Sequence, residues 1–241
     1  MDFVLVHGAW HGGWCWAEFE AAMQARGHRT HAVTLTGLGE RSHLLSEDLS
    51  PDLHVLDVVN TIKWRELDQV ILVGHSYGGT IISGVAGLMP DKIAGLVYLD
   101  ALVPDKSNQS LFDIGHPDRL AKFQAQIDQG AIGLEPDLFE AWTSDLHKQA
   151  WLKQLCTLHP VGCMTQGVTL TGREAEIEHK LYILAERNKP SLFWAEFDKL
   201  AGQSGWTRAK IDALHDVMVE QPLALADMIL GWLDDQNLEL T

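Results

Sequence analysis

The sequence predicts an α/β fold in which a mostly parallel β-sheet is covered by helices on both faces. Short apolar segments alternate along the 241 residues with segments of helical spacing, and this alternation predicts right-handed βαβ crossovers. In residues 70–79, VILVGHSYGG, an apolar run passes through a glycine-rich turn into a helical pattern. With 46% hydrophobic and 21% charged residues, the composition suits one globular domain with a sizeable core.

Six apolar runs, each bounded by glycine, charged or polar residues, are predicted to be the strands. They are Phe3–Val6, His31–Leu35, Val70–Val73, Ile93–Leu99, Leu181–Ala185 and Ala209–Leu214. Helices are predicted between the early strands and near the end of the chain, at Trp16–Arg26, Leu53–Glu66, Thr80–Leu88 and Pro222–Asp235. The last of these begins with a proline, which suits a first helical turn.

The alternation stops between about residues 103 and 178, where helical patterns at Leu120–Gln129 and Leu138–Leu155 dominate. We interpret residues 105–178 as a helical cap, inserted into a core formed by residues 1–104 and 179–241. Two further βα units are the less favoured alternative.

The acidic composition limits the classes of partner. The formal net charge of −15, from 33 acidic and 18 basic residues, argues against nucleic acid and anionic membranes and favours a neutral small molecule. No export signal follows Met1, and no apolar stretch is long enough to span a membrane. Cys15, Cys156 and Cys163 cannot all pair with one another and match no metal-site spacing, so we expect a cytoplasmic location.

The strongest local signal is the G-x-S-x-G pattern centred on Ser76, directly after an apolar strand and directly before a helix. The turn must be so tight that the serine backbone is strained, and glycines at positions 74 and 78 remove side chains that would collide there. A glycine-rich turn without chemistry is the alternative. The context favours Ser76 as a nucleophile presented at the carboxyl edge of the sheet.

A serine hydroxyl is a weak nucleophile at neutral pH and needs a positioned base to take its proton. His215 follows the last predicted strand and precedes the final helix, which places it at the same sheet edge as Ser76. His179 precedes a strand and is expected at the opposite edge, while His147 and His159 fall within the predicted cap. His215 is therefore the predicted base.

The oxyanion of a tetrahedral intermediate needs hydrogen-bond donors. One is predicted to be the backbone N–H of Tyr77, which follows the nucleophile, and the other that of Ala9, in the glycine-containing loop after the first strand. His7 and His11 lie in the same loop, and we expect them to support the backbone rather than to take part in chemistry.

Two carboxylates follow strands between Ser76 and His215 and could complete a catalytic triad. Asp100 ends an unbroken apolar strand and should emerge beside the nucleophile turn, so it is favoured. Glu186 is the alternative, although it could instead pair with Arg187 or face solvent.

Several aromatic side chains could form an apolar substrate pocket, although at helical spacing most are expected to belong to the core. They are Phe112, Phe123, Phe139, Trp142, Trp151, Phe193 and Trp194.

Four segments together carry a family resemblance: residues 3–14 (FVLVHGAWHGGW), 37–41 (GLGER), 73–79 (VGHSYGG) and 96–104 (LVYLDALVP). They resemble the hydroxynitrile lyase and plant methylesterase-like group of α/β-hydrolases, especially its bacterial carboxylesterases. This resemblance implies the α/β-hydrolase fold, with a six-stranded sheet, a small helical cap over the serine, and neither a metal ion nor an organic cofactor.

The group includes both esterases and lyases, and two positions bear on the choice. Its plant lyases carry a threonine and a lysine, which bind the cyanohydrin and stabilise cyanide, at the positions of Gly8 and Asp216. We expect the Asp216 carboxylate to repel a developing cyanide anion. The resemblance also places the usual triad acid at Asn188, which cannot supply a charge.

The sequence therefore predicts a serine carboxylesterase that hydrolyses small or medium neutral esters through an acyl-enzyme. A hydroxynitrile lyase is the enzymatic alternative, and a non-catalytic small-molecule receptor on a hydrolase scaffold is the alternative from another class. The sequence allows a homodimer without deciding the oligomeric state.

Overall fold

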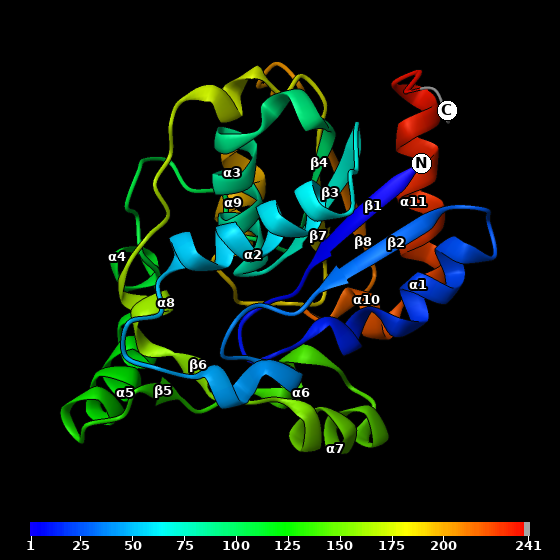
Figure 1. Ribbon diagram of the computed structural model, residues 1–241. Coiled ribbons are helices and arrows are strands. Elements are labelled where there is room, and N and C mark those ends of the chain that lie inside the picture. The colour runs from blue at the N-terminus through cyan, green and yellow to red at the C-terminus, as the bar shows by residue number, and fades with distance from the viewer. Residues whose placement is uncertain (239–241) are drawn as a thin grey trace.

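Six parallel strands form one sheet in the order β2-β1-β3-β4-β7-β8 (Figure 1). The computed structural model describes residues 1–238. The strands are β1 (Asp2–Val6), β2 (Arg29–Val33), β3 (Val70–His75), β4 (Ile93–Leu99), β7 (Lys180–Ala185) and β8 (Trp206–Ile211). This confirms the predicted α/β-hydrolase fold with a six-stranded parallel sheet.

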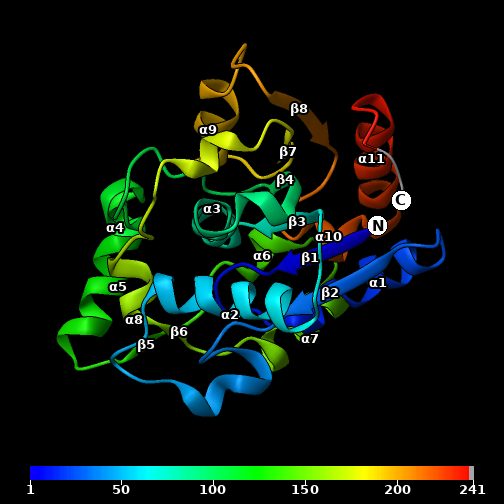
Figure 2. The ribbon, with the colours of Figure 1, turned by 45° about the horizontal axis from the view of Figure 1, so that its top comes forward.

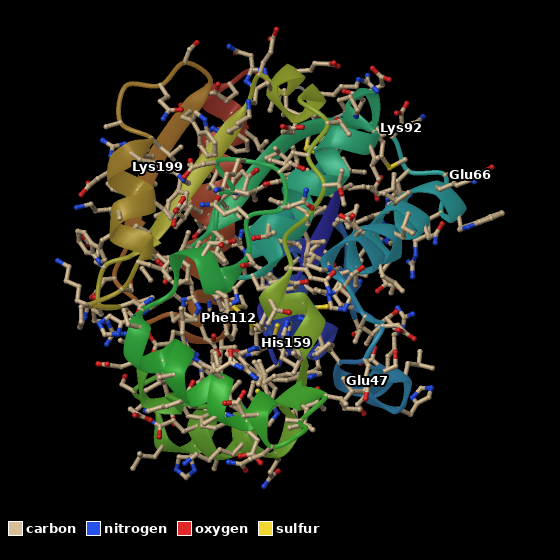
Figure 3. The ribbon with its side chains drawn as sticks, turned by 90° about the vertical axis from the view of Figure 1, so that its left-hand side faces the viewer. Glu47, Glu66, Lys92, Phe112, His159 and Lys199 are labelled. Atoms are coloured by element: carbon tan, nitrogen blue, oxygen red, sulfur yellow. The ribbon has the colours of Figure 1, made fainter. Side chains whose placement is uncertain are left out.

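Helices cover both faces of the sheet, which is why its central strands are continuous apolar runs. One face packs against α2 (Pro51–Trp64), α3 (Gly78–Leu88) and α9 (Phe193–Lys199), and the other against α1 (Ala17–Gln24) and α11 (Pro222–Asp235) (Figure 2). Two hydrophobic cores result, one on each face. Charged side chains such as Glu66 and Lys92 point outward from these layers (Figure 3).

The longest helices, α2 and α11, have 14 residues each. The start of α2 is set by Ser50, whose side chain accepts a hydrogen bond from the backbone N–H of Leu53, and by Pro51 in the first turn. No helix within residues 1–238 is both long and apolar enough to cross a membrane.

The chain between β4 and β7 forms short helices beyond the carboxyl ends of the strands (Figure 1). These are α4 (Leu111–Ile114), α5 (Pro117–Asp128), α6 (Phe139–Trp142), α7 (Leu146–Leu155) and α8 (Val161–Thr165), with an antiparallel pair of two-residue strands, β5 (Gly133–Leu134) and β6 (His159–Pro160). Because β4 pairs directly with β7, the alternative of two further βα units in the sheet is wrong.

Two strand predictions and one helix prediction need correction. The strand predicted at Ala209–Leu214 is β8, Trp206–Ile211, and that predicted at His31–Leu35 is β2, Arg29–Val33. Both are edge strands, whose exposed positions interrupt the apolar pattern. The helix predicted at Leu138–Leu155 is broken into α6 and α7 because the Asp145 side chain accepts hydrogen bonds from two backbone N–H groups and caps a new helix.

Candidate active site

Ser76 lies in a strained turn between β3 and α3. Its φ is 54°, a left-handed conformation that costs a non-glycine residue about 1–3 kcal/mol. The glycines of the motif make the turn sterically accessible: a Cβ atom on Gly74 would lie 2.6 Å from the carbonyl oxygen of Gly78, and one on Gly78 would lie 2.6 Å from that of Val6. The backbone N–H of Ser76 donates to the Leu99 carbonyl at 3.2 Å, which ties the turn to β4.

A pocket of about 790 Å³ opens at this edge of the sheet. Ser76, His215, Ala9 and Tyr77 all line it, so the structure brings these four predicted site residues together. Three of the seven aromatic candidates, Phe123, Trp142 and Phe193, also line the pocket. The other four, Phe112, Phe139, Trp151 and Trp194, do not line it.

One wall of the pocket carries an ion pair. Arg119 donates from Nη2 to Asp137 Oδ1 at 2.8 Å, and its guanidinium lies 5.3 Å from the ring centroids of both Trp10 and Phe123. Both members of the pair line the pocket. The positive charge is thus matched by a carboxylate on the same wall.

His215 is hydrogen-bonded to the carboxylate that was favoured as its partner. The distance from His215 Nδ1 to Asp100 Oδ2 is 2.7 Å. Asp100 is fully buried at the end of β4, and its other oxygen accepts a hydrogen bond from the Ala185 N–H at 3.1 Å. Asn188 donates from Nδ2 to Asp100 Oδ2 at 2.7 Å. The side chains that follow β4 and β7 therefore meet behind the histidine.

The backbone and ring of His215 are held on several sides. Its N–H donates to the Ala141 carbonyl at 3.3 Å, and its own carbonyl accepts a hydrogen bond from His75 Nε2 at 3.0 Å. The Phe193 ring stacks on the imidazole with an interplanar angle of 13°. Within residues 1–238 no hydrogen bond joins the Ser76 hydroxyl to His215, and in unliganded enzymes this bond is often long and tightens only when substrate binds.

The Ala9 and Tyr77 amides are free to serve a ligand. In the described part of the chain neither N–H donates a hydrogen bond, and both residues line the pocket. His7 accepts the Leu35 N–H at Nε2 (3.1 Å) and donates from Nδ1 to the Gly8 carbonyl (2.7 Å). Because C=O and N–H point in opposite directions across a trans peptide, this bond turns the Ala9 N–H away from His7. His7 thus has the supporting role expected of it.

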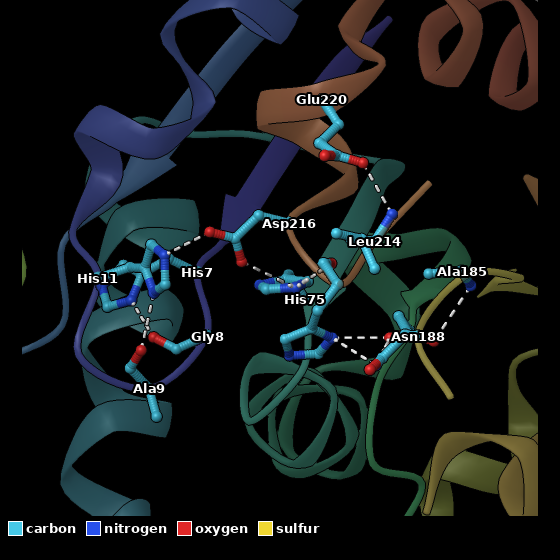
Figure 4. A network of polar contacts seen from close by, with 12 residues as sticks. His7, Gly8, Ala9, His11, His75, Ala185, Asn188, Leu214, Asp216 and Glu220 are labelled. Carbon is cyan, nitrogen blue, oxygen red and sulfur yellow. Dashed lines mark hydrogen bonds and ion pairs between the residues drawn. The ribbon is translucent and has the colours of Figure 1, made fainter. Parts of the chain in front are cut away.

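Burial lowers the pKa of His7 to about 3, so its ring is neutral. His11 differs, because both of its ring nitrogens face oxygen acceptors. Nδ1 donates to the Ala9 carbonyl at 2.8 Å and Nε2 to Asp216 Oδ2 at 3.0 Å, an arrangement that requires a protonated ring (Figure 4). Burial alone would lower the pKa of His11, but the charge and hydrogen bond of Asp216 outweigh it, and the pKa is raised.

The position of Asp216 corrects one expectation. Its carboxylate is fully buried against His11 and does not line the pocket. Contrary to the expectation, it therefore does not face a departing anion. The lysine of the plant lyases is still missing at this position. At Gly8, a Cβ atom would lie 2.8 Å from His75 Nδ1 and 3.0 Å from Ser76 Cβ, so the threonine of the lyases would not fit without rearrangement.

The His11–Asp216 pair leads to a prediction on stability. Because the pKa of His11 is raised in the folded state, the pair should stabilise the fold fully below the ordinary histidine pKa of about 6.5 and progressively less as pH rises through the raised value. Asp216→Asn should lower the free energy of unfolding by up to about 3–5 kcal/mol at about pH 6, and the deficit should shrink as pH rises. Urea unfolding of the wild type and of Asp216→Asn, at a series of pH values from about 6 upward, measures this difference in the free energy of unfolding.

Glu186→Gln, which alters an exposed carboxylate, is the matched control and should change neither the midpoint nor its pH dependence. A deficit for Asp216→Asn that stayed constant with pH would mean that His11 is neutral in the fold.

The remaining candidates lie away from the pocket. Glu186 is exposed, with Lys210 Nζ at 3.8 Å from its carboxylate, and does not contact His215. His147 is exposed on α7. His179 directly precedes β7, and its side chain contacts Gln236. His159 is buried in the segment between β4 and β7, where it accepts the Trp10 N–H at 3.3 Å (Figure 3).

Asn188 is the residue whose place in the site was not recognised. From the sequence it stands out only as the position where the usual acid is missing. Its location just after β7, at the same sheet edge as Ser76 and His215, could have indicated that it belongs to the site.

Comparisons with known proteins place this geometry in context. A model of the alpha/beta hydrolase family matches residues 3–228. A carbendazim hydrolyzing esterase from Nocardioides sp. (strain SG-4G) is 38% identical over 237 residues, which cover 95% of this chain and 98% of that protein. An alpha-hydroxynitrile lyase from Arabidopsis thaliana is 37% identical over 107 residues, or 44% of this chain and 42% of that protein.

Among solved structures, an extracellular alpha/beta-hydrolase from a Paenibacillus species superposes with a TM-score of 0.82. The two chains are 22% identical, and the match covers 96% of this chain and 98% of the other. At this identity the likeness concerns the fold.

Proposed function

The chain belongs to the alpha/beta hydrolase family, in the group that contains methylesterases and hydroxynitrile lyases, and from this premise we propose that it hydrolyses small or medium neutral carboxylic esters through an acyl-enzyme on Ser76. The observation that carries the proposal is the 2.7 Å hydrogen bond between His215 and the buried Asp100, behind the pocket that Ser76 lines. A receptor would need no such pair behind a strained serine.

In the acylation half, the Ser76 oxygen attacks the ester carbonyl carbon while its proton passes to His215 Nε2. The Asp100 carboxylate stabilises the resulting imidazolium through Nδ1. The negative oxygen of the tetrahedral intermediate accepts hydrogen bonds from the free N–H groups of Ala9 and Tyr77. Collapse of the intermediate breaks the bond to the alcohol oxygen, which takes the proton from His215 and leaves.

In the deacylation half, water takes the place of the alcohol. His215 removes one proton from the water as it attacks the acyl carbon, and the same two amides hold the oxyanion. The proton then returns to the Ser76 oxygen as the carboxylic acid departs. The ester and one water molecule supply all the atoms that are exchanged, and each transferred proton passes through His215.

The pocket supports a neutral substrate of moderate size. Its volume of about 790 Å³ lies in the range of about 300–1,000 Å³ that holds small organic ligands. Phe123, Trp142 and Phe193 provide apolar walls, and the Arg119 charge in the lining is paired with Asp137. The net charge of −15 further disfavours polyanionic substrates.

A panel of chromogenic esters that vary separately in acid and alcohol tests the proposal. We expect hydrolysis of short and medium neutral esters, with weaker activity on esters that carry additional negative charge. Carbendazim belongs in the panel because the relative that matches 95% of this chain is named for it. Release of cyanide from mandelonitrile without ester hydrolysis would identify a lyase, and saturable binding without turnover would identify a receptor.

The pH dependence of the reaction provides a prediction for His215. Below its optimum, kcat/KM should rise about tenfold per pH unit, because only the deprotonated imidazole can accept the Ser76 proton. His215→Gln should lose both this slope and nearly all activity. His147→Gln, a change at an exposed histidine on α7, should keep the slope and the rate. An unchanged pH profile in His215→Gln would require another base.

Two earlier expectations stay predictions, namely the boundaries of the cap at residues 105–178 and a cytoplasmic location, and the oligomeric state, for which the sequence allows a homodimer, stays open. Cell fractionation tests the location, and light scattering of the purified chain tests the oligomeric state. Within the described residues all three cysteines are free.

A further inference from the structure

Trp10, which directly follows Ala9, has a strained backbone. Its φ is 67°, in the left-handed region that a bulky side chain rarely adopts. Such a conformation persists only where the surrounding contacts hold it in place. Because Ala9 is the neighbouring residue, the contacts that hold Trp10 also bear on the amide that is to bind the oxyanion.

Three hydrogen bonds join Trp10 to the chain between β4 and β7, which is far from it in the sequence. The Trp10 N–H donates to His159 Nδ1 at 3.3 Å, and the indole Nε1 donates to the Leu134 carbonyl at 2.9 Å. The Trp10 carbonyl accepts the Thr157 N–H at 3.0 Å. Leu134 and His159 are paired residues of β5 and β6, so this small antiparallel sheet holds both the backbone and the ring of Trp10.

The Trp10 ring is also packed on the pocket side. The Trp142 ring stacks on it with centroids 5.8 Å apart and an interplanar angle of 28°, and the Phe123 centroid lies at 6.0 Å. The Arg119 guanidinium lies 5.3 Å from its centroid. Trp10 is only 5% exposed, and a ring enclosed in this way has little freedom to turn.

The two peptide groups that flank the Cα atom of Ala9 are both fixed. In the first, the Gly8 carbonyl accepts His7 Nδ1–H at 2.7 Å (Figure 4). In the second, the Ala9 carbonyl accepts His11 Nδ1–H at 2.8 Å while the Trp10 N–H binds His159. Because each peptide is planar, fixing both planes fixes φ and ψ of Ala9 and thereby the direction of its N–H.

His159 is the member of this arrangement that comes from the chain between β4 and β7. Its Nδ1 accepts the Trp10 N–H, so the ring proton must be on Nε2. The residue is fully buried, and burial keeps the pKa of His159 well below its usual value. The ring is therefore neutral and keeps the lone pair that the Trp10 N–H needs.

On the basis of the proposed function, we propose that Trp10 and His159 are positioning residues for the oxyanion hole. They fix the Ala9 amide by tying the peptide that follows it to the β5–β6 pair. Neither side chain touches the reacting atoms in this proposal. Both act through the direction of the Ala9 N–H, which should matter most when the oxyanion has formed.

Two substitutions at position 159 separate the hydrogen bond from the packing. Asparagine and leucine both branch at Cγ, but only asparagine offers an oxygen near the place of Nδ1. His159→Leu should lower kcat by about 10²-fold with little change in KM, because the Ala9 amide loses its direction while the pocket remains. His159→Asn should stay within about fivefold of the wild type, because its oxygen can accept the Trp10 N–H.

Trp10→Phe tests the other attachment. The phenyl ring keeps most of the packing but cannot donate to the Leu134 carbonyl, so kcat should fall about tenfold with little change in KM. Two exposed residues provide matched controls. His147→Leu and Trp64→Phe should both behave as the wild type in kcat, KM and urea midpoint.

A pair of inhibitors distinguishes positioning from a general loss of structure. A trifluoromethyl ketone adds to the Ser76 oxygen, the serine proton passes to His215, and the carbonyl oxygen becomes an oxyanion. The corresponding trifluoromethyl carbinol fills the pocket without this step. His159→Leu should weaken the ketone by about 10²-fold, in step with kcat/KM, while the carbinol binds as tightly as to the wild type.

Hydrogen exchange measures the attachment without any turnover. By NMR, the Trp10 backbone N–H should be protected in the wild type, should exchange at least about tenfold faster in His159→Leu, and should be protected again in His159→Asn. If the wild type hydrolyses no ester, the proposed function fails, while the exchange data still show whether His159 fixes this peptide.

Three outcomes would overturn the inference. The first is a His159→Leu variant with the wild-type urea midpoint, kcat and ketone affinity. The second is an equal loss of affinity for ketone and carbinol, which would mean that the pocket and not the oxyanion hole has changed. If His159→Leu does not fold, His159→Asn and Trp10→Phe decide, and an unprotected Trp10 N–H in the wild type is the third.

Discussion

Ser76→Ala is expected to abolish ester hydrolysis, with kcat lower by about 10⁶-fold. The change removes only the hydroxyl, while the turn with φ of 54° and the close glycine contacts of Gly74 and Gly78 stay as they are. The residual rate should lie within about 10³–10⁴-fold of the uncatalysed reaction, because the Ala9 and Tyr77 amides still hold the oxyanion. Steady-state kinetics, with circular dichroism and urea unfolding to verify the fold, measure the effect.

A covalent probe identifies the nucleophile independently. A phosphonate should add its mass once to the wild type, at Ser76, and should not label Ser76→Ala. Ser204→Ala, a change at an exposed serine outside the pocket, should be labelled and active like the wild type. If Ser76→Ala kept half of the activity, or were labelled at the same rate, the nucleophile would have to be sought elsewhere.

Asp100→Asn is expected to lower kcat by up to about 10⁴-fold while KM changes little. The substitution conserves volume but removes the charge that stabilises the imidazolium, and it places an amide 2.7 Å from the Asn188 amide and from His215 Nδ1. Glu186→Gln should stay within roughly tenfold of the wild type, because Glu186 is exposed and faces Lys210.

Pre-steady-state kinetics distinguish the step that is affected. Loss of imidazolium stabilisation should slow both formation and hydrolysis of the acyl-enzyme, since His215 acts as base in each. If Glu186→Gln were the more impaired of the pair, the acid would be Glu186, and the close contact of Asp100 with His215 would be structural.

The fold class and the strained turn at Ser76 could be predicted from the sequence because both depend on short-range patterns. Strand, turn and helix are contiguous in residues 70–88, and the glycines at positions 74 and 78 leave little freedom in how they connect. The limits of β2 and β8 were predicted less well, because edge strands expose positions that break the apolar pattern.

The order of residues along the chain also predicted the placement of His215, since the carboxyl ends of parallel strands meet at one edge of the sheet. It favoured Asp100 as the triad acid but kept Glu186 as an alternative, because the two residues follow neighbouring strands. The register of β4 against β7 decided which carboxylate reaches the histidine: Asp100 turns inward to the Ala185 N–H, while Glu186 points to solvent.

The tertiary structure alone brought Asn188 to Asp100 and paired His11 with Asp216, residues that lie 88 and 205 positions apart in the sequence. Local periodicity carries no information on such contacts, because they depend on how strand ends and loops converge once the sheet has formed. A buried charge gains its partner only at that stage, and the cost of leaving it unpaired makes those distant contacts specific.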